Sequence, residues 1–502
     1  MIYTGENILA NRIKHAFEKW RSETALGIGG VDYSYHELDK ASDKIAAYLL
    51  LNHRGERFVG VWGEKLFFTY AAIVGIIKAG KVYVPLNPKF PPGRNQCIID
   101  EAGLKFLFTP SDVYSDLFKE LKINILQSEI QDGVCEPFQI EYCDYDPAYL
   151  LFTSGSTGKP KGVLINNHQL VHYLDAVGEF IQVTPGDCLS HTFDLTFDLS
   201  LHDIFLAFTN GAKLCVPGEN DLILPSRYIK SNRLTHWFSV PTLLKLMSKL
   251  RQLKVNEFPD LKYAMFCGEA LPADLALQFK TSLSDSAKVF NLYGPTEATI
   301  AVSSYQLMNS PKELDGNLCI GKIFSGNDYK IQSSGEINSN SGELLLKGEQ
   351  VINSYFNSEY DERFFFKDQE GQLWYRTGDM VKADEHANLY FAGRKDSQIK
   401  LNGYRIELPE IESAICKLFS LANSCCFVDD TGGNHQLIAI LETENEIQVN
   451  TLTSRLGELL PAYMIPKFFV FLNEFPLNSN QKIDRVELTN WYKNNYGKKR
   501  NH

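Results

Sequence analysis

Residues 58–86 read FVGVWGEKLFFTYAAIVGIIKAGKVYVPL. Two short apolar runs rich in β-branched residues, at 58–62 and 82–86, flank a longer apolar segment that is followed by Gly80. Such short runs predict buried strands, and a glycine directly after a longer apolar segment is a usual helix-end signal. The stretch therefore predicts a strand, a helix closed by Gly80 and a second strand, which is the unit of an α/β protein.

The same alternation continues in four later stretches. They are AKLCVPG (212–218), THWFSVPTLLKLMSKL (235–250), LKYAMFCGEAL (261–271) and AKVFNLYGP (287–295). Strands that alternate with helices usually pair in parallel and present their carboxyl ends to one crevice, where α/β proteins bind their ligands. We therefore expect an α/β fold with a ligand site at that edge.

The composition changes twice farther along the chain. After about residue 310 it shifts toward Gly, Asn and Ser, as in SSGEINSNSGELLLKGEQ (333–350), which indicates a small β unit at about 310–395. From about residue 396, alternation around Asn402-Gly403 predicts a hairpin that leads into an amphipathic helix. We expect a large domain at 1–395, with stacked α/β subdomains and the β unit, and a small α+β domain at 396–502.

The totals of the chain exclude several classes of protein. Its 502 residues, 44% hydrophobic, suffice for several packed cores, and the net charge of −11 argues against a nucleic-acid-binding surface. The start carries scattered charges and no run of about 18 apolar residues occurs, so we expect a cytoplasmic monomer without membrane insertion. Ten cysteines without a CxxC pair favour reduced thiols over disulfides or a zinc site.

Residues 150–163, LLFTSGSTGKPKGV, form an apolar run that ends in Ser, Thr and Gly beside two lysines. Backbone amides, hydroxyls and ammonium groups together favour an anion, so the stretch predicts a phosphate-binding loop. It is not a Walker A loop, because only two residues separate Gly155 from Gly158 and Pro160 stands where that motif has Ser or Thr. Taken alone, the stretch is also compatible with a plain turn.

Five further motifs follow this loop. They are FDLS (197–200), NLYGPTE (291–297), YRTGD (375–379), GRKDSQIKLNGYRIE (393–407) and NSNQKIDR (478–485). With the loop, KAGKVYVPLNPKFP (78–91) and LPAYMIPKFF (460–469), they resemble the motifs of the adenylate-forming superfamily in order and approximate spacing. FDLSLHD, MFCGEAL and YGPTEATIAV make the chain most similar to stand-alone amino-acid adenylation enzymes, such as D-alanine:carrier-protein ligases, and to adenylation domains of nonribosomal peptide synthetases.

The resemblance implies a two-step reaction and a small mobile C-terminal domain. A carboxylate attacks the α-phosphate of ATP, which releases pyrophosphate and leaves an acyl-AMP; a phosphopantetheine thiol then takes the acyl group. ATP and Mg2+ are the implied cofactors. The implied partner is a carrier protein in trans, because TGGNHQL (431–437) lacks the serine that would accept phosphopantetheine.

For the nucleotide, the resemblance implies residues from several motifs. Lys482 would reach between substrate carboxylate, phosphate and ribose, and Glu297 would hold Mg2+. Tyr293 would lie against adenine, and Asp379, with Arg394 nearby, would bind the ribose hydroxyls. The implied catalytic residues are Lys482, Glu297 and Thr153. The implied ATP-binding residues are Thr153, Ser154, Gly155, Ser156, Thr157, Gly158, Lys159, Gly268, Asn291, Tyr293, Gly294, Thr296, Asp379, Arg394 and Lys482.

For the substrate, the most informative residue is Asp198 of FDLS. Its carboxylate would pair with the α-ammonium group of an amino acid, although without the other motifs a helix or turn cap is the simpler reading. The other implied pocket walls are Leu199, His202, Phe238, Met265, Cys267, Leu292, Ile300 and Ala301. This apolar pocket suits a small side chain, and we expect alanine, D over L, with Cys267 against its α-carbon and methyl group. His202 is either a partner for a polar substrate or a satisfied core residue.

For the second step, the resemblance implies that the C-terminal domain rotates, so that Lys482 leaves and the hairpin at 399–406 enters. Asp396 would be the hinge, and Gly403 at the hairpin tip would line the channel for the pantetheine arm. Gly403 also has a structural role, since both central residues of a type I′ turn need a positive φ.

Two other functions remain open. An acyl- or aryl-CoA ligase would share the nucleotide-binding residues but would not need Asp198. A non-catalytic nucleotide-binding module would be expected to lack Lys482 or Glu297, and both are present. Each motif taken singly has a plain structural alternative, so the adenylating ligase is favoured by their joint order.

Overall fold

The computed structural model of the protein describes residues 2–4, 9–109, 124–126, 139–141, 146–155, 160–333, 336–337, 339–429, 435–478 and 483–496. The chain forms two compact units. The first unit comprises Met1–Pro88, Ile99–Phe152 and Lys161–Lys395, and the second comprises Lys89–Ile98, Thr153–Pro160 and Asp396–His502. None of the helices in the described ranges has the length and apolar composition that crossing a membrane requires.

The stretch at residues 58–86 folds as its sequence predicts. It forms β4 (Phe58–Trp62), α3 (Phe67–Lys78) and β5 (Val82–Leu86), and Gly80 after the helix has a φ of 66°. β4 pairs in parallel with β5 and with β6 (Phe106–Phe108). These strands belong to a six-stranded sheet in the order β10-β9-β5-β4-β6-β7, with β7 at Asn124–Leu126, β9 at Pro147–Thr153 and β10 at Lys161–Asn166.

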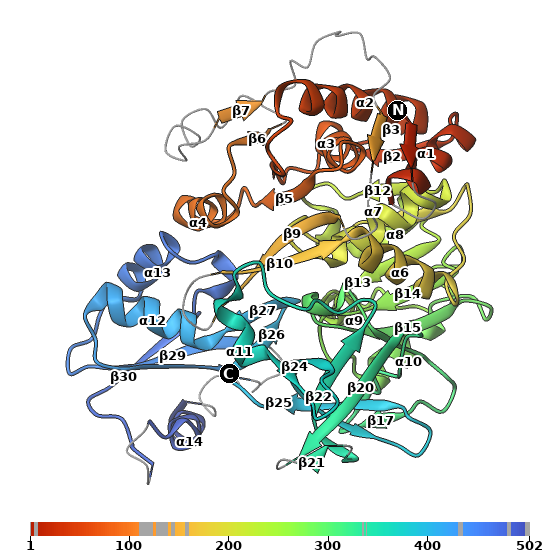
Figure 1. The fold of residues 1–502 in the computed structure, drawn as a ribbon. Helices are drawn as coiled ribbons and strands as arrows, with labels where there is room; N and C mark the ends of the chain where they lie inside the picture. Colours follow the sequence, from red (N-terminus) through yellow and green to blue (C-terminus); the bar gives the residue numbers. More distant parts are fainter. Residues whose placement is uncertain are drawn as a thin grey trace. The chain divides into compact units, whose positions relative to one another are not determined.

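The four later stretches of alternating strand and helix build a second sheet (Figure 1). Its order is β19-β16-β15-β14-β13-β11-β12-β2-β3, and every pair from β15 to β2 is parallel. The expected parallel arrangement is thus confirmed, and it puts the carboxyl ends of these strands on one edge. The strands are β2 (Thr24–Ile28), β3 (Val31–Ser34), β11 (Cys188–Ser190), β12 (Lys213–Val216), β13 (His236–Ser239), β14 (Tyr263–Phe266), β15 (Lys288–Tyr293), β16 (Ser303–Gln306) and β19 (Lys322–Ile323).

The helices of the α/β part carry ordinary end signals. Ser34 and Glu37 form a capping box at the start of α2, and Gly211, with a φ of 77°, closes α7. Besides α3, the helices are α1 (Leu9–Lys19), α2 (Tyr35–Asn52), α4 (Pro92–Ala102), α6 (Asn167–Gly178), α7 (Leu199–Asn210), α8 (Pro225–Ser231), α9 (Pro241–Lys249) and α10 (Ala273–Thr281).

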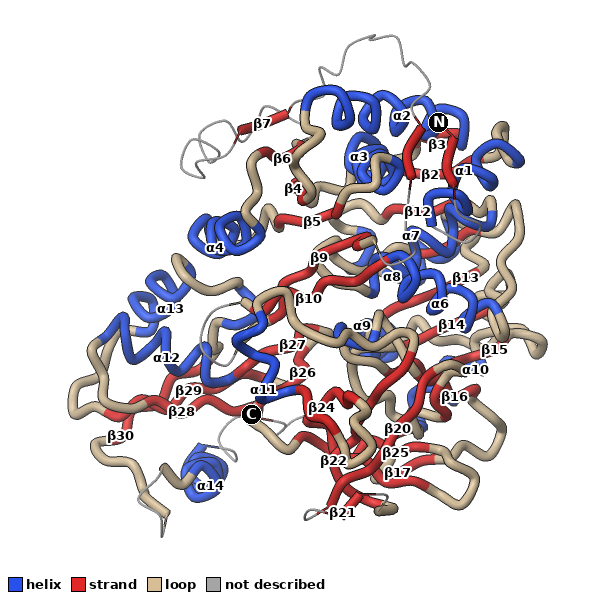
Figure 2. Tube along the Cα trace, in the orientation of Figure 1, coloured by secondary structure: helices blue, strands red, loops and turns tan. Residues whose placement is uncertain are grey.

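The β unit expected after about residue 310 is an antiparallel sheet that begins at Asn327 (Figure 2). The sheet has the order β21-β20-β22-β24-β23, and β25 pairs with β24. Before it, β17 (Glu313–Leu314) pairs with β18 (Asn317–Leu318), and residues 322–323 belong to the nine-stranded sheet. Its elements are β20 (Asn327–Ser333), β21 (Glu336–Ile337), β22 (Ser341–Gly348), α11 (Asp361–Phe364), β23 (Phe365–Lys367), β24 (Leu373–Ala383) and β25 (Leu389–Arg394).

The second unit contains the expected hairpin and helix. Strands β26 (Gln398–Leu401) and β27 (Tyr404–Glu407) are joined by Asn402 and Gly403, whose φ angles of 53° and 82° fit a type I′ turn. The other elements are α12 (Leu408–Phe419), β28 (Ser424–Asp429), β29 (Gln436–Glu442), α13 (Val449–Gly457), β30 (Phe468–Leu472) and α14 (Arg485–Tyr496). The expected mixed α/β class is therefore confirmed, whereas rotation about Asp396 stays a prediction.

At Gly75, α3 packs closely against α2. A Cβ at this position would lie 2.8 Å from the Ile45 Cβ and 2.8 Å from the Ser42 carbonyl oxygen. We predict that Gly75→Ala lowers the free energy of unfolding by about 1–3 kcal/mol, because overpacking outweighs the better helix propensity of alanine. The measurement is urea unfolding followed by circular dichroism.

Gly178 provides the matched control for this prediction. It ends α6, and no described atom would lie within 4 Å of a Cβ added there. Gly178→Ala should therefore be neutral or stabilising by up to about 1 kcal/mol. Equal effects of the two substitutions would contradict the packing argument.

Candidate active site

The predicted walls of the amino-acid pocket come together in the first unit. Phe238 and Met265 are paired residues of β13 and β14, and Leu292 lies on the neighbouring strand β15. All seven apolar or thiol walls belong to the main hydrophobic core of the first unit, namely Leu199, Phe238, Met265, Cys267, Leu292, Ile300 and Ala301. Parallel pairing thus brings Phe238, Met265 and Leu292, which span about 50 residues of sequence, to the carboxyl edge of the sheet.

Asp198 lies at the start of α7 and is 7% exposed. Its side chain makes no hydrogen bond that caps this helix, so the helix-cap reading is not supported. The Asp198 charge and, above all, burial raise the pKa values of the Tyr149 and Tyr173 hydroxyls, which indicates that Asp198 lies near both rings. A carboxylate at this depth is costly unless donors or a cation face it. The position therefore suits recognition of an ammonium group.

His202 is a fully buried, neutral wall of the same region. Its Nδ1 lies 2.7 Å from the Tyr173 hydroxyl, and its ring centroid lies 4.4 Å from that of Phe238. Burial lowers the pKa of His202 to about 3. Within the described part of the chain, Nε2 has no hydrogen-bond partner. One ring nitrogen is therefore tied to the protein, and the other is buried without a partner among the described residues.

The predicted ribose and adenine residues form one hydrogen-bonded group. The Tyr293 hydroxyl donates to Asp379 Oδ2 at 2.5 Å, and Arg394 Nη1 donates to Asp379 Oδ1 at 2.8 Å. Arg394 also donates to the Thr377 carbonyl at 2.7 Å. Asp379 and Arg394 are paired residues of β24 and β25, and Tyr293 ends β15. The group joins the β unit to the nine-stranded sheet. Burial, together with the nearby Asp379 carboxylate, raises the pKa of the Tyr293 hydroxyl well above its usual value.

Glu297 lies in the turn Thr296–Ala298 and is fully buried. The Tyr355 hydroxyl donates to its Oε1 at 2.6 Å, and the Ile352 amide donates to its backbone oxygen at 2.9 Å. The described residues include no cluster of three or more His, Cys, Asp or Glu side chains that could hold a metal. A single carboxylate nevertheless fits Mg2+, which proteins often hold with one carboxylate plus phosphate oxygens and waters.

Three other predicted nucleotide residues have structural constraints of their own. A Cβ on Gly294 would lie 2.5 Å from the Ala301 Cα, so only glycine fits there. Gly268 has a φ of 90°, a left-handed conformation that favours glycine. Asn291 donates from its amide to the Cys319 carbonyl at 3.0 Å, which fixes the end of β15.

The predicted phosphate-binding loop is described only at its two ends. Thr153 ends β9, and its buried hydroxyl has no hydrogen-bond partner among the described residues. Ser154 donates to the Arg405 carbonyl at 2.9 Å, within the second unit. In the same unit, Asp396 accepts a hydrogen bond from the Gln398 amide at 3.1 Å. The predicted residues that lie outside the described ranges are Ser156, Thr157, Gly158, Lys159 and Lys482.

Three residues of the site were missed by the sequence analysis. Tyr173 bonds His202, Tyr355 bonds Glu297, and Gln350 bonds the loop after Glu297. Tyr173 belongs to no motif, and Gln350 and Tyr355 fall in a stretch without a recognisable chemical pattern. No local signal could have linked them to partners that lie 29 to 58 residues away.

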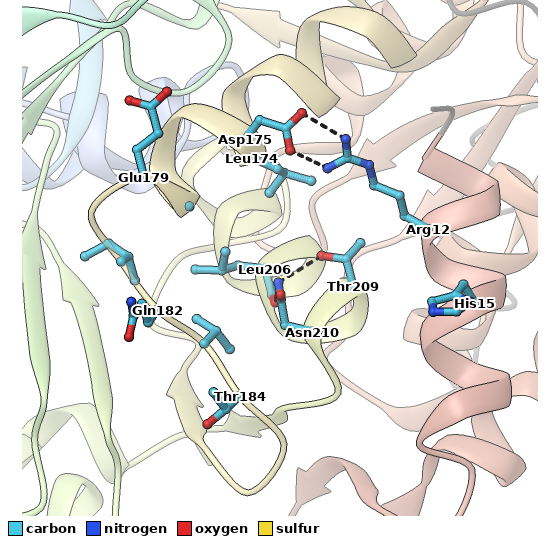
Figure 3. Close-up of a pocket in the computed structure, with 13 residues that line it drawn as sticks. Arg12, His15, Leu174, Asp175, Glu179, Gln182, Thr184, Leu206, Thr209 and Asn210 are labelled. Atoms are coloured by element: carbon cyan, nitrogen blue, oxygen red, sulfur yellow. Dashed lines mark hydrogen bonds and ion pairs between the residues drawn. The ribbon is translucent and has the colours of Figure 1, made fainter. Parts of the chain in front are cut away.

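A groove of about 680 Å³ also lies in the first unit, between α1, α6 and α7 (Figure 3). The Arg12 guanidinium from α1 reaches across it to Asp175 on α6, with nitrogen–oxygen distances of 2.6 and 2.8 Å. None of its lining residues belongs to the motifs described above. The groove is therefore separate from the candidate active site.

Comparison with known proteins now decides the family. The model of the family described as AMP-binding enzyme matches residues 13–356, more than half of the chain. The chain belongs to this family. The superfamily and the adenylating ligase class expected from the motifs are thereby confirmed, and ATP use follows from the family.

Curated relatives of this AMP-binding enzyme cover almost its whole length. The D-alanine--D-alanyl carrier protein ligase of Listeria monocytogenes serotype 4b is 31% identical over 96% of this chain and 98% of its own length. The zwittermicin A synthase ZmaJ of Bacillus cereus is 32% identical over 91% and 89%. Gramicidin S synthase 2 of Aneurinibacillus migulanus is 29% identical over 97% of this chain, which spans only 11% of that synthase.

Solved structures show the same fold. The adenylation domain AlmE of Vibrio cholerae, in complex with glycyl-adenosine-5′-phosphate, matches with a TM-score of 0.84 at 26% identity, over 98% of this chain and 99% of that one. The o-succinylbenzoate CoA synthetase of Bacillus subtilis matches with a TM-score of 0.83 at 23% identity, over 96% and 98%. The second likeness shows the fold alone.

Buried histidines make this AMP-binding enzyme sensitive to acid. Burial lowers the pKa of His202 to about 3, that of His236 to about 4 and that of His191 well below its usual value. In the unfolded chain these groups titrate near about 6.5, so below that pH the unfolded state binds more protons and folding stability falls. We predict a loss of up to about 1.4 kcal/mol per pH unit for each histidine between about pH 6.5 and 5.

The measurement is urea unfolding at a series of pH values. His202→Gln removes one titrating group, so its stability should fall less steeply as the pH is lowered. The same slope in His202→Gln and in the wild type would show that His202 does not remain neutral in the folded protein.

Proposed function

We propose that the protein activates a small amino acid with ATP, releases pyrophosphate, and transfers the aminoacyl group to the phosphopantetheine thiol of a separate carrier protein. The observation that carries this proposal is the burial of the Asp198 carboxylate beside apolar walls at the carboxyl edge of the parallel sheet. The similarity to a D-alanine--D-alanyl carrier protein ligase over nearly both full lengths supports it. So does the similarity to an adenylation domain solved with glycyl-adenosine-5′-phosphate.

In the first step, the substrate carboxylate attacks the α-phosphorus of ATP, a phosphorus–oxygen bond to the leaving group breaks, and pyrophosphate departs with the electron pair. A carboxylate is already ionised at neutral pH, so the site has to position two anions rather than remove a proton. Tyr293, Asp379 and Arg394 would hold the nucleoside, and Asp198 the ammonium group. Lys482 would neutralise the developing charge. Glu297 would hold Mg2+, which would supply further charge neutralisation when bound.

In the second step, the pantetheine thiolate attacks the carbonyl carbon, and AMP leaves with the electron pair of the broken carbon–oxygen bond. We propose that rotation about Asp396 moves Lys482 out of the active site and moves the hairpin at 399–406 into it. Gly403 would leave room for the pantetheine arm. The two half-reactions would therefore use different faces of the small domain.

Alanine remains the proposed substrate, D over L. The pocket walls are bulky and apolar, so space rather than polarity would limit the side chain. Cys267 is 1% exposed and belongs to the same cluster, so it can favour one enantiomer by its size. A difference of one methyl group in fit corresponds to roughly 10- to 200-fold in kcat/KM. The CoA-ligase alternative would not need Asp198 to recognise its substrate.

Pyrophosphate exchange across amino acids tests this assignment. Wild type should prefer alanine or another small amino acid over propionate, the matching acid without an amine. In Asp198→Ala the ammonium group would enter an apolar pocket without its counter-ion, which typically costs about 2–5 kcal/mol. We predict that kcat/KM for the amino acid falls roughly 30- to 5,000-fold while ATP binding is retained.

Asp175→Ala is the control for Asp198→Ala. It removes a carboxylate from a solvent-exposed ion pair, and such pairs contribute little. Its exchange kinetics should match wild type. Normal amino-acid activation by Asp198→Ala, or a wild-type preference for propionate, would move the assignment to the CoA-ligase class.

Lys482→Ala separates the two half-reactions. We predict that it nearly abolishes aminoacyl-AMP formation but largely preserves transfer from preformed aminoacyl-AMP to the carrier thiol, because the lysine is proposed to act in the first step alone. Lys493→Ala, a surface change on α14, should leave both rates at wild-type values. Equal losses in both half-reactions would refute this division of labour.

A further inference from the structure

The loop that follows Glu297 holds two residues in a strained conformation. Thr299 and Ile300 have φ angles of 54° and 71°. Both are β-branched, and such residues are costly in the left-handed region. Ile300 and Ala301, the next two residues after Thr299, are predicted walls of the amino-acid pocket. The strained segment therefore lies where the substrate side chain would be recognised, and something must hold it there.

Gln350, just after β22, makes the contacts that can hold this segment. The side chain is fully buried. Its amide nitrogen donates to the carbonyl oxygens of Ala301 at 2.8 Å and of Ala298 and Thr299 at 3.4 Å each. Because three carbonyl oxygens face this position, the amide NH2 and not the amide oxygen must point to the loop.

Gln350 is itself fixed on its other sides. The Asn327 amide donates to Gln350 Oε1 at 2.9 Å, and Asn327 Oδ1 accepts from the Gln350 backbone amide at 3.1 Å. The Thr299 hydroxyl donates to the Gln350 carbonyl at 2.6 Å. The glutamine thus connects β20 to the strained loop and leaves its amide only one orientation.

We infer that Gln350 is a positioning residue for amino-acid selection: it clasps the Ala298–Ala301 backbone, which holds Thr299 and Ile300 in the left-handed conformation, and so places Ile300 and Ala301 against the substrate side chain. The inference rests on the proposed function, because it takes these two residues as pocket walls. Glu297 is held separately, by Tyr355 and by the Ile352 amide. Loss of the clasp therefore affects the amino-acid side of the site more than the nucleotide side.

Gln350→Met tests the clasp, because methionine keeps the volume and removes the donors. In pyrophosphate exchange, KM for the preferred amino acid should rise about tenfold or more, the glycine-to-alanine ratio of kcat/KM should shift, and KM for ATP should stay unchanged. Asn327→Ala loosens Gln350 without touching the loop, so it should shift the same quantities in the same direction but less. It also serves if Gln350→Met does not fold.

Asn388→Leu is the matched structural control. Asn388 is another buried amide of the first unit, and it donates to both carboxylate oxygens of Asp384, at 2.9 and 2.8 Å. This variant should lower thermal stability but leave the amino-acid KM and the glycine-to-alanine ratio unchanged. Gln350→Met kinetics equal to wild type, or the same kinetic shift in Asn388→Leu, would overturn the inference.

Thr299→Gly tests the role of the strain. Glycine adopts a positive φ without steric cost, so the loop would need the clasp less. Added to Gln350→Met, it should restore part of the lost kcat/KM, and absence of rescue would overturn the strain argument. If wild type activates an acid without an amine, the proposed function fails. The same variants then still test whether Gln350 positions the pocket, because the KM for that acid should rise in Gln350→Met.

Discussion

The burial of carboxylates is the physical constraint on which the candidate site depends. Glu297 and Asp379 are 0% and 2% exposed, and an ionised carboxylate at that depth needs strong hydrogen-bond donors. Tyr355 donates to Glu297, while Tyr293 and Arg394 donate to Asp379. The donors and acceptors come from the nine-stranded sheet and from the β unit. These polar groups are therefore satisfied only when the two sheets have packed together, which makes the site a product of that packing.

The segment between Pro295 and Val302 shows how closely the two halves of the site are connected. Its first turn carries Glu297, the proposed Mg2+ ligand, and its last residues, Ile300 and Ala301, belong to the hydrophobic core of the first unit. The close backbone approach at Gly294 and the left-handed residues leave this segment little freedom. Strain stored next to a binding site is tolerated only where surrounding contacts over-determine the backbone, and buried hydrogen bonds from the β unit supply those contacts here.

Much of the fold and part of the site could be predicted from local patterns. Strand–helix–strand alternation at 58–86 and the Asn402-Gly403 turn are decided by neighbours in the sequence, and the structure has both. That Arg394 lies near Asp379 was implied by the family resemblance, and the structure pairs the two residues. The partners of Glu297 and His202 could not be predicted in this way. Tyr355 and Tyr173 contact them only because separate strands and helices converge, and no periodicity or spacing records such a contact.

By itself, the sequence determined the α/β class, the parallel sheet with its ligand edge, the hairpin and, through the order of its motifs, the AMP-binding family. These features depend on hydrophobic periodicity, on turn residues and on short groups of chemically specific residues, all of which are local. Only the tertiary structure decided which buried polar groups satisfy one another. Gln350 illustrates the reason: its amide bonds to carbonyl oxygens 49 to 52 residues away, and packing across two sheets, not chain proximity, brings them within reach.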